Sequence, residues 1–171
     1  MAGEMRGRRL VAPPGTATRP TTDKVREAVF NALGSLDAVV DAHVADLYAG
    51  SGALGFEALS RGAAHCTFVE RDRGALSAIE ENRAALGVRD RTRVRQGDPL
   101  TMGATVPAEL VFADPPYGFA DWPRLLAGLA GSVELVVAEA ADEVPAPPGW
   151  TATRARRYGR TWVTFLERGH R

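Results

Sequence analysis

Short apolar runs alternate along the chain with stretches in which apolar residues recur every three or four positions. The first pattern is typical of buried strands and the second of amphipathic helices. Strands are predicted over residues 44–48, 66–70, 92–94, 110–113 and 133–138. Helices are predicted over residues 21–34, 56–62, 76–87 and 122–129. Strands that alternate with helices in this way indicate an α/β fold, with a parallel sheet covered on both faces.

The two ends of the chain follow different patterns. Residues 150–157 and 161–167 look extended on either side of a short turn, so they must pair as antiparallel strands. Residues 1–20 are basic and rich in turn residues, and we expect an arm or hairpin outside the core, or else a solvated tail. The sequence Thr21-Thr22-Asp23 is typical of a helix cap. We therefore divide the chain into an arm, residues 1–20, and one domain, residues 21–171.

Length and composition narrow the class of protein. The 171 residues suffice for one domain, and equal numbers of acidic and basic residues give a formal net charge of zero. Cys66 is the single cysteine and the three histidines are scattered, so we expect neither a disulfide nor a metal site. The sequence contains no stretch apolar enough to span a membrane and no signal-peptide core at its start. We expect a cytoplasmic, monomeric protein.

One short stretch carries the clearest chemistry. Asp114-Pro115-Pro116-Tyr117 follows the apolar run 110–113, at the carboxyl end of a predicted strand, where open α/β sheets bind ligands. The prolines fix the backbone and remove two N–H donors, which leaves rigid carbonyls free to accept hydrogen bonds. A carboxylate, free carbonyls and a stacking ring together suit a planar base with an exocyclic amine. The plainer interpretation is a proline-rich turn with an incidental acid.

A glycine-rich loop after the first strand is compatible with two cofactors. Its glycines match the dinucleotide-binding spacing: Gly50, Gly52 and Gly55. Glu70 lies at the end of the next strand, where an acid holds ribose hydroxyls, and this favours NAD at first. However, Asp46 in the preceding strand would repel a pyrophosphate but suits an amino group. With Glu70 for ribose and Asp98 for adenine, S-adenosylmethionine explains the loop better than NAD does.

Longer segments resemble a known family. The glycine loop together with Asp-Pro-Pro-Tyr is similar to class I S-adenosylmethionine-dependent methyltransferases that modify exocyclic amines. The segments 6–10, 18–31 and 49–62 resemble the RsmD family, and the resemblance covers essentially the whole chain. It implies a Rossmann-like, seven-stranded sheet in the order 3-2-1-4-5-7-6, with strand 7 antiparallel. The chain departs from the family in a shorter segment before Arg6, and in Tyr117 where many members have Phe.

The same resemblance implies an activity, which is methylation of the N2 amine of one guanine in bacterial 16S ribosomal RNA, either free or within a 30S particle. The expected catalytic residues are Asp114, Pro115, Pro116 and Tyr117. The expected residues for S-adenosylmethionine are Asp46, Gly50, Gly52, Glu70 and Asp98. Asp114 and a carbonyl of Asp114 or Pro115 would accept the amine hydrogens, and Tyr117 would stack on the base.

Arginines are expected to hold the RNA despite the zero net charge. The predicted RNA-binding residues are Arg6, Arg8, Arg9 and Arg19. A second cluster is compatible with the same role, although a solvated strand edge is the simpler interpretation: Arg154, Arg156, Arg157 and Arg160. Three alternatives to the favoured function stay open. They are a DNA adenine-N6 methyltransferase, which shares Asp-Pro-Pro-Tyr, an NAD-dependent oxidoreductase, and an RNA-binding module with a dead site.

Overall fold

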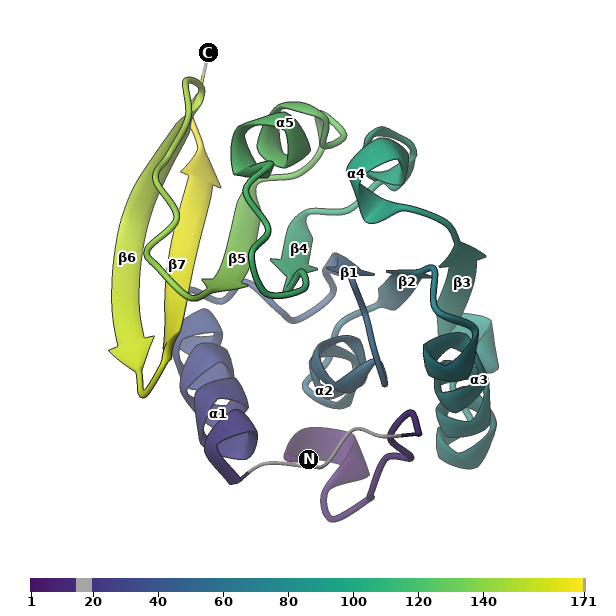
Figure 1. Cartoon of the computed structure of the whole chain (residues 1–171). Helices are drawn as coiled ribbons and strands as arrows, with labels where there is room; N and C mark the ends of the chain where they lie inside the picture. The colour runs from purple at the N-terminus through teal and green to yellow at the C-terminus, as the bar shows by residue number, and fades with distance from the viewer. Residues whose placement is uncertain (15–19, 171) are drawn as a thin grey trace.

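The computed structural model describes residues 1–14 and 20–170. Its centre is a seven-stranded sheet in the order β3-β2-β1-β4-β5-β7-β6, in which β7 runs antiparallel to both of its neighbours (Figure 1). The strands are β1 (His43–Leu47), β2 (His65–Glu70), β3 (Thr92–Gln96), β4 (Leu110–Ala113), β5 (Leu135–Ala140), β6 (Trp150–Tyr158) and β7 (Thr161–Arg168). The predicted strand order and the antiparallel closing pair are confirmed.

Helices cover both faces of this sheet, as the alternating pattern predicts. They are α1 (Pro20–Ser35), α2 (Ala53–Ser60), α3 (Arg73–Leu86), α4 (Pro99–Met102) and α5 (Trp122–Ala127), with short 3-10 turns η1 (Gly3–Met5), η2 (Arg89–Arg91) and η3 (Gly103–Thr105). The first three helices lie on one side of the sheet, and α4 and α5 on the other (Figure 1). Phe56 and Ile79 belong to the core on the first side, and Trp122 and Leu126 to the core on the second.

Several predicted boundaries are wrong by a few residues. The first strand ends at Leu47, and Tyr48 takes a left-handed conformation with φ of 58°. The fifth strand is Leu135–Ala140, because Val133 is buried in a loop and not in the ladder. The third strand extends to Gln96, and the four-residue α4 that follows is too short to show helical periodicity.

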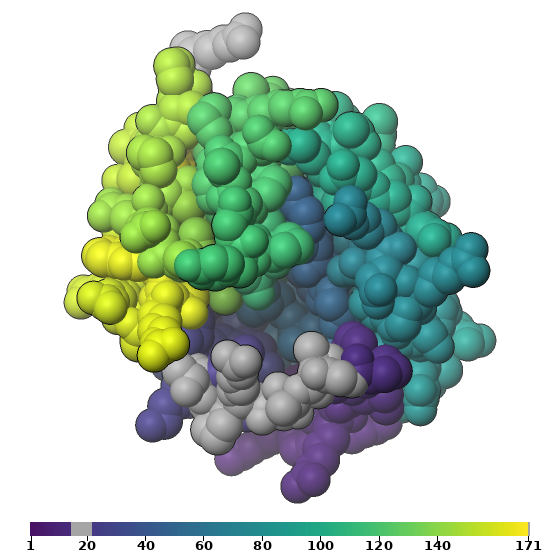
Figure 2. Space-filling model, viewed as in Figure 1, coloured from purple at the N-terminus to yellow at the C-terminus, as the bar shows by residue number. Residues whose placement is uncertain are grey.

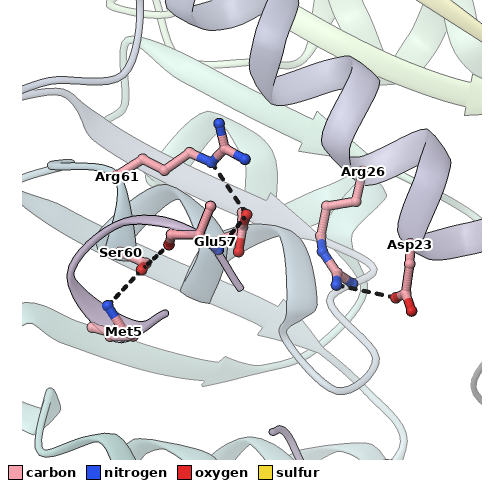
Figure 3. Close-up of polar contacts among 7 residues, drawn as sticks. Met5, Asp23, Arg26, Glu57, Ser60 and Arg61 are labelled. Carbon is pink, nitrogen blue, oxygen red and sulfur yellow. Dashed lines mark hydrogen bonds and ion pairs between the residues drawn. The ribbon is translucent and has the colours of Figure 1, made fainter. Parts of the chain in front are cut away.

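The start of α1 also differs from the prediction. The helix begins at Pro20 instead of after a cap at Thr21-Thr22-Asp23. Proline suits the first helical position because its fixed φ is helical and its missing N–H would have no partner there. Within α1, Arg26 pairs with Asp23 at 3.1 Å (Figure 3). None of the helices in residues 1–14 and 20–170 is long and apolar enough to cross a membrane.

The first residues pack on α2, which differs from the expected arm outside the core. The Met5 N–H donates to Ser60 Oγ at 2.8 Å (Figure 3). The Met5 side chain is buried in the core. Glu57 Oε1 accepts from Ala2 N–H at 3.3 Å and from Arg61 Nε at 3.1 Å. Apolar burial of Met5 explains why a basic, turn-rich segment is held here. The division of the chain at residue 20 stays a prediction.

Candidate active site

The carboxyl ends of five parallel strands meet at one edge of the sheet. Leu47 of β1 pairs with Val69 of β2 on one side and with Ala113 of β4 on the other. Ala113 in turn pairs with Ala138 of β5. The next residues in β2, β4 and β5 are Glu70, Asp114 and Glu139. This register therefore aligns three acids along the edge, and two of them are sequence-predicted site residues.

Asp46 lies two residues deeper, within β1, where it pairs with Phe68 and Phe112. It is only 2% exposed, and its Oδ2 accepts a hydrogen bond of 2.9 Å from the Gly55 N–H. Burial raises the pKa of Asp46 well above its usual value; the Gly55 hydrogen bond opposes this, whereas the nearby Asp114 and Glu70 add to it. The Asp46 side chain therefore links β1 to the first turn of α2, and it places a carboxyl beneath the glycine loop.

The glycines of the loop have two different structural roles. Gly50 has φ of 59°, and a side chain added there would meet open space, so its backbone is accessible to a ligand. At Gly55 an added Cβ would lie 2.4 Å from the Phe68 ring and 2.6 Å from Cys66 Sγ. Glycine is required there because α2 packs closely on β2. The expected strand–loop–helix context of the motif is present.

Glu70 and Asp98 are both held by backbone N–H groups. Glu70 Oε2 accepts from Gly50 at 2.9 Å, and its Oε1 accepts from Arg71 and Asp72, each at 3.0 Å. Asp98 caps α4 by accepting from Leu100 N–H at 3.0 Å, and it is exposed. The two carboxylates follow neighbouring strands, β2 and β3. They are thus fixed in place at the ends of these strands, as the cofactor assignment requires.

Tyr48 lies between the glycine loop and the Asp-Pro-Pro-Tyr loop. Its ring packs edge-on against Phe119, with 5.6 Å between the centroids, and its hydroxyl is buried without a partner among the described residues. Burial, and then the negative charge of Asp98, raise the pKa of Tyr48 to about 12. A left-handed backbone is costly for a tyrosine, and such conformations cluster at functional sites.

Asp114 and Glu139 line a cleft of about 1050 Å³ at this edge of the sheet. Water reaches Asp114 through the mouth of the cleft, yet the surrounding protein atoms raise its pKa to about 6. The pKa of Glu139 is raised to about 8 by burial, and then by the negative charges of Asp114 and Asp46. Neither side chain accepts a hydrogen bond from another residue in 1–14 or 20–170. Both carboxyls are therefore available to a ligand.

The loop after Asp114 presents an aromatic ring to solvent. The Tyr117 side chain is 96% exposed. The Pro116 carbonyl accepts from Phe119 N–H at 3.2 Å, which closes the turn. The carbonyls of Asp114 and Pro115 receive no such bond from the described part of the chain. The structure thus brings together the carboxylate, rigid carbonyls and ring that the sequence predicted. Figure 2 shows this face of the molecule, with a hollow beneath the green loop that follows β4.

Distant segments form the remaining walls of the cleft. Thr22 and Val25 come from the first turns of α1, and residues 158–161 from the turn between β6 and β7. The turn lies at the carboxyl end of β5 because β7 runs antiparallel to β5, which places Trp162 opposite Ala140. The start of α1 lies nearby because Val25 and Val29 share a core cluster with Val137 and Val163. The cleft is therefore closed by elements at opposite ends of the chain.

The expected RNA-binding arginines of the N-terminus do not line this cleft. Arg6, Arg8 and Arg9 are exposed, and Arg8 donates to the carbonyl of Ala85 at the end of α3. Arg19 falls outside the described residues. Asn82 of α3 links this segment to the glycine loop. Its Oδ1 accepts from the Val11 N–H at 2.7 Å, and its Nδ2 donates to the Val11 carbonyl at 3.0 Å and to the Ser51 carbonyl at 3.1 Å.

Sequence reasoning missed Glu139, Tyr48 and Asn82. Glu139 was recognised only as the end of a strand, although an acid at the carboxyl end of a parallel strand is the same signal that selected Glu70 and Asp98. Asn82 carries no such signal, because a single asparagine inside a helix pattern does not show what it contacts. As to metals, residues 1–14 and 20–170 contain no group of three or more His, Cys, Asp or Glu side chains that could hold an ion.

The sequence is similar to several known proteins. A family described as Conserved hypothetical protein 95 matches residues 1–167. The protein YlbH of Bacillus subtilis (strain 168) is 36% identical over 181 aligned residues, which cover 98% of this chain and 97% of YlbH. Ribosomal RNA small subunit methyltransferase D of Escherichia coli (strain K12) is 43% identical over 119 residues, which cover 68% of this chain and 59% of that protein.

Solved structures agree with these relatives. The Escherichia coli protein yhhF superposes with a TM-score of 0.86 at 34% identity, covering 100% of this chain and 97% of yhhF. Magnesium protoporphyrin IX methyltransferase (ChlM) of Synechocystis PCC 6803, solved with bound SAM, superposes with a TM-score of 0.68 at 13% identity, covering 91% of this chain and 87% of ChlM. The second similarity shows the fold alone, which is that of S-adenosylmethionine-dependent methyltransferases.

Proposed function

Because the chain belongs to the RsmD family of methyltransferases, we propose that it transfers a methyl group from S-adenosylmethionine to the exocyclic N2 amine of a guanine in small-subunit ribosomal RNA. The observation that carries this proposal is the loop Asp114–Tyr117 at the mouth of the cleft. Its carboxyl and two of its carbonyls accept no hydrogen bond from residues 1–14 and 20–170, and its ring is 96% exposed. An amine with two hydrogens on a flat base matches all of these groups.

The residues around the glycine loop fit S-adenosylmethionine. Gly50 leaves its backbone open to close approach, as a bound cofactor requires. Glu70 and Asp98 are fixed at neighbouring strand ends for ribose and adenine, and Asp46 offers a carboxyl to an amino group, whose positive charge would favour the ionised acid. The cofactor supplies a methyl group on a sulfonium sulfur, which is a good leaving group. The NAD alternative is disfavoured by Asp46, because a buried acid beneath the loop would repel a pyrophosphate.

The protein must make the amine a better nucleophile, because its lone pair is delocalised into the ring. Asp114 would accept one amine hydrogen, and the carbonyl of Asp114 or Pro115 would accept the other. These acceptors favour a pyramidal nitrogen and stabilise the positive charge that develops on it. With a pKa of about 6, Asp114 is ionised at neutral pH, and it is also placed to take the released proton. Tyr117 holds the base by stacking.

The choice of guanine over adenine rests on membership of the RsmD family, because the Asp-Pro-Pro-Tyr motif is shared with adenine-N6 methyltransferases. Glu139 lines the same cleft as Asp114, one strand away. With a pKa of about 8, it is mostly protonated at neutral pH, so it offers a hydrogen-bond donor as well as an acceptor and does not itself distinguish the two bases.

The test uses the purified protein with methyl-labelled S-adenosylmethionine and two substrates, protein-free 16S RNA and 30S subunits, both from cells that lack the modification. The RNA is digested to nucleosides and the labelled product is identified by mass spectrometry. We expect label in N2-methylguanosine at one position. Label in N6-methyladenosine, or no label with either substrate while the protein binds S-adenosylmethionine, would overturn the proposal.

A further inference from the structure

The exposed edge of the sheet next to the cleft carries a set of arginines. β6 is the last strand in the sheet order, so one of its sides has no strand neighbour. Between Trp150 and Tyr158 it is exposed along most of its length. We call four residues of this strand and its turn the arginine edge: Arg154, Arg156, Arg157 and Arg160. All four are exposed.

A bulge sets the direction of these side chains. The register with β7 moves by one residue between Ala152 and Arg154, so Thr153 is the extra residue. Beyond the bulge, Arg154 lies opposite Phe165 and Arg156 opposite Val163, on the face that α1 covers. Arg157 lies opposite Trp162 and points to the other face. The bulge therefore decides which face each arginine takes, and the alternation of the strand puts cations on both faces, with Arg160 in the turn.

These charges are not paired with acids in the described part of the chain. The sequence contains no Asp or Glu from residue 144 to residue 166. Within residues 1–14 and 20–170, none of the four arginines forms an ion pair, although four other arginines do. Arg157 Nε instead donates to the Gly159 carbonyl at 2.9 Å, which stiffens the turn. A local cationic surface of this kind acts over about 10 Å at 0.1 M salt, whatever the net charge.

The arginine edge leads into the cleft. Tyr158, Gly159 and Arg160 line the cleft that Asp114 and Tyr117 also line. A base held on Tyr117 would bring its own strand of RNA past this turn, with the neighbouring phosphates beside β6. Arginine suits phosphate because its planar fork donates two parallel hydrogen bonds. Charged residues on an edge strand also prevent the edge from pairing with another sheet. That role would not require the turn with Arg160 to line the cleft.

We infer that the arginine edge is the docking surface for the RNA strand that flanks the target base, and that it binds this strand through its phosphates. The inference rests on the proposed function, and it names the part of the protein that holds the substrate. The simpler interpretation of the sequence, a solvated strand edge, is thereby replaced. The N-terminal residues Arg6, Arg8 and Arg9 lie apart from the cleft and are left as a secondary contact.

The test compares three variants with the wild-type protein. The first combines Arg154→Ala, Arg156→Ala and Arg160→Ala. The second replaces the same residues by lysine, which keeps the charge but not the fork. The third is a matched control of exposed arginines elsewhere on the molecule: Arg89→Ala, Arg93→Ala and Arg124→Ala. Melting temperature and S-adenosylmethionine affinity are measured for all three. RNA affinity is measured by fluorescence anisotropy over a range of salt concentrations.

We expect the alanine variant to bind RNA more weakly and to show a shallower salt dependence, by about 0.7–0.9 in the log–log slope for each phosphate that it no longer binds. Cofactor affinity should stay unchanged. The lysine variant should keep most of the slope, and the control should behave as wild type. Equal affinity and slope for the alanine variant and wild type would overturn the inference. An alanine variant that self-associates but still binds RNA normally would overturn it too.

A second measurement needs no substitution, so it holds even if the alanine variant fails to fold. Wild-type protein is cross-linked to target RNA that carries 4-thiouridine beside the methylated position, and the cross-linked peptide is identified by mass spectrometry. We expect cross-links in residues 150–162. Cross-links confined to other segments would contradict the inference. If wild-type protein methylates RNA but the arginine edge is not involved, this inference alone fails; if it methylates no RNA, the proposed function fails first.

Discussion

The carboxyl edge of the sheet has two halves that are built differently. In the half formed by β1, β2 and β3, every predicted acid already accepts a hydrogen bond from the backbone: Asp46 from Gly55, Glu70 from Gly50 and Asp98 from Leu100. In the half formed by β4 and β5, Asp114 and Glu139 accept none from the described residues, and Tyr117 is 96% exposed. The acids of the first half are held by hydrogen bonds within the folded chain, whereas the second half presents groups that are open to water and to a ligand.

The two halves also differ in what positions their acids. The backbone N–H groups that hold Asp46 and Glu70 belong to the glycine loop and α2, so local folding also orients the acids that we propose for the cofactor. Asp114 and Glu139 are instead held by strands and prolines, and burial, followed by the charges of Asp114 and Asp46, raises the pKa of Glu139 to about 8. Such an unsatisfied pair is unfavourable in isolation, and perturbed acids in clefts are characteristic of functional sites. The two halves should therefore respond differently to substitution.

The largest expected effect is at Asp114. Asp114→Ala should lower the rate of methylation by about 10²–10³, because it removes one preorganised acceptor from the transition state. Cofactor affinity should be unchanged, since the cofactor half is intact. Single-turnover methylation and calorimetric titration of S-adenosylmethionine measure the two quantities. Asp142→Ala, which changes an acid in the same cleft, is the matched control and should remain active. Near-normal turnover of Asp114→Ala would show that the substrate half works without this carboxyl.

The next effect is at Tyr117. Tyr117→Ala should weaken the binding of substrate RNA by about 1–3 kcal/mol, the typical contribution of a base stacked on an aromatic ring. Tyr117→Phe should be mild, because stacking needs the ring and not the hydroxyl. RNA affinity and the KM for RNA measure this effect. If the phenylalanine variant is as impaired as the alanine variant, the hydroxyl and not the ring is the functional group.

A smaller effect, and one on stability, is expected in the cofactor half. Asp46→Ala leaves the Gly55 N–H buried without its acceptor, which typically costs about 1–3 kcal/mol of folding free energy. Asp46→Asn keeps an acceptor for that N–H, so it should fold nearly as well and still bind S-adenosylmethionine more weakly for lack of charge. Chemical denaturation and cofactor titration separate these outcomes. Equal cofactor affinity for Asp46→Asn and wild type would remove Asp46 from the cofactor site.

The remaining expected effect is a dependence of stability on pH, at Glu139. Its pKa is about 8 in the folded protein against an ordinary value of 4.5, so folding favours the protonated form. The contribution of Glu139 to the free energy of unfolding should therefore be most favourable below pH 4.5, and it should decrease as the pH rises toward 8. Glu139→Gln removes the cost of ionisation, so its advantage in melting temperature over wild type should grow from pH 4.5 to pH 8. A difference that does not vary with pH would contradict the raised pKa.

Much of the fold was predictable because its signals are local. Alternating apolar runs identified every strand of the sheet, and the glycine spacing located the strand–loop–helix unit that holds Gly50 and Gly55. The boundaries failed where tertiary packing overrides the pattern: Tyr48 is apolar enough to continue a strand but turns left-handed beneath Phe119. The strand order itself came from the family resemblance and not from periodicity, because pairing between distant strands leaves no local pattern.

The candidate site was predictable in part for the same reason. Glu70 ends a recognisable strand, Asp98 and Asp114 follow one, and Asp46 lies within one. The position of the β6–β7 turn beside the cleft was not visible in the local pattern, because it follows from the antiparallel pairing of β7 with β5. The N-terminal segment shows the opposite error. Its charge suggested an arm, but Met5 is buried in the core, and this depends on a contact with α2 that is 55 residues away in sequence.

The central claim is that the open half of the edge receives a guanine and methylates its N2 amine. The most direct measurement compares target RNA that carries guanosine at the methylated position with the same RNA carrying inosine, which lacks only the N2 amine. The account predicts that both RNAs bind with affinities that differ by less than about tenfold, roughly 1.4 kcal/mol, and that only the guanosine RNA accepts labelled methyl. Methyl transfer to the inosine RNA at the same rate would contradict the account.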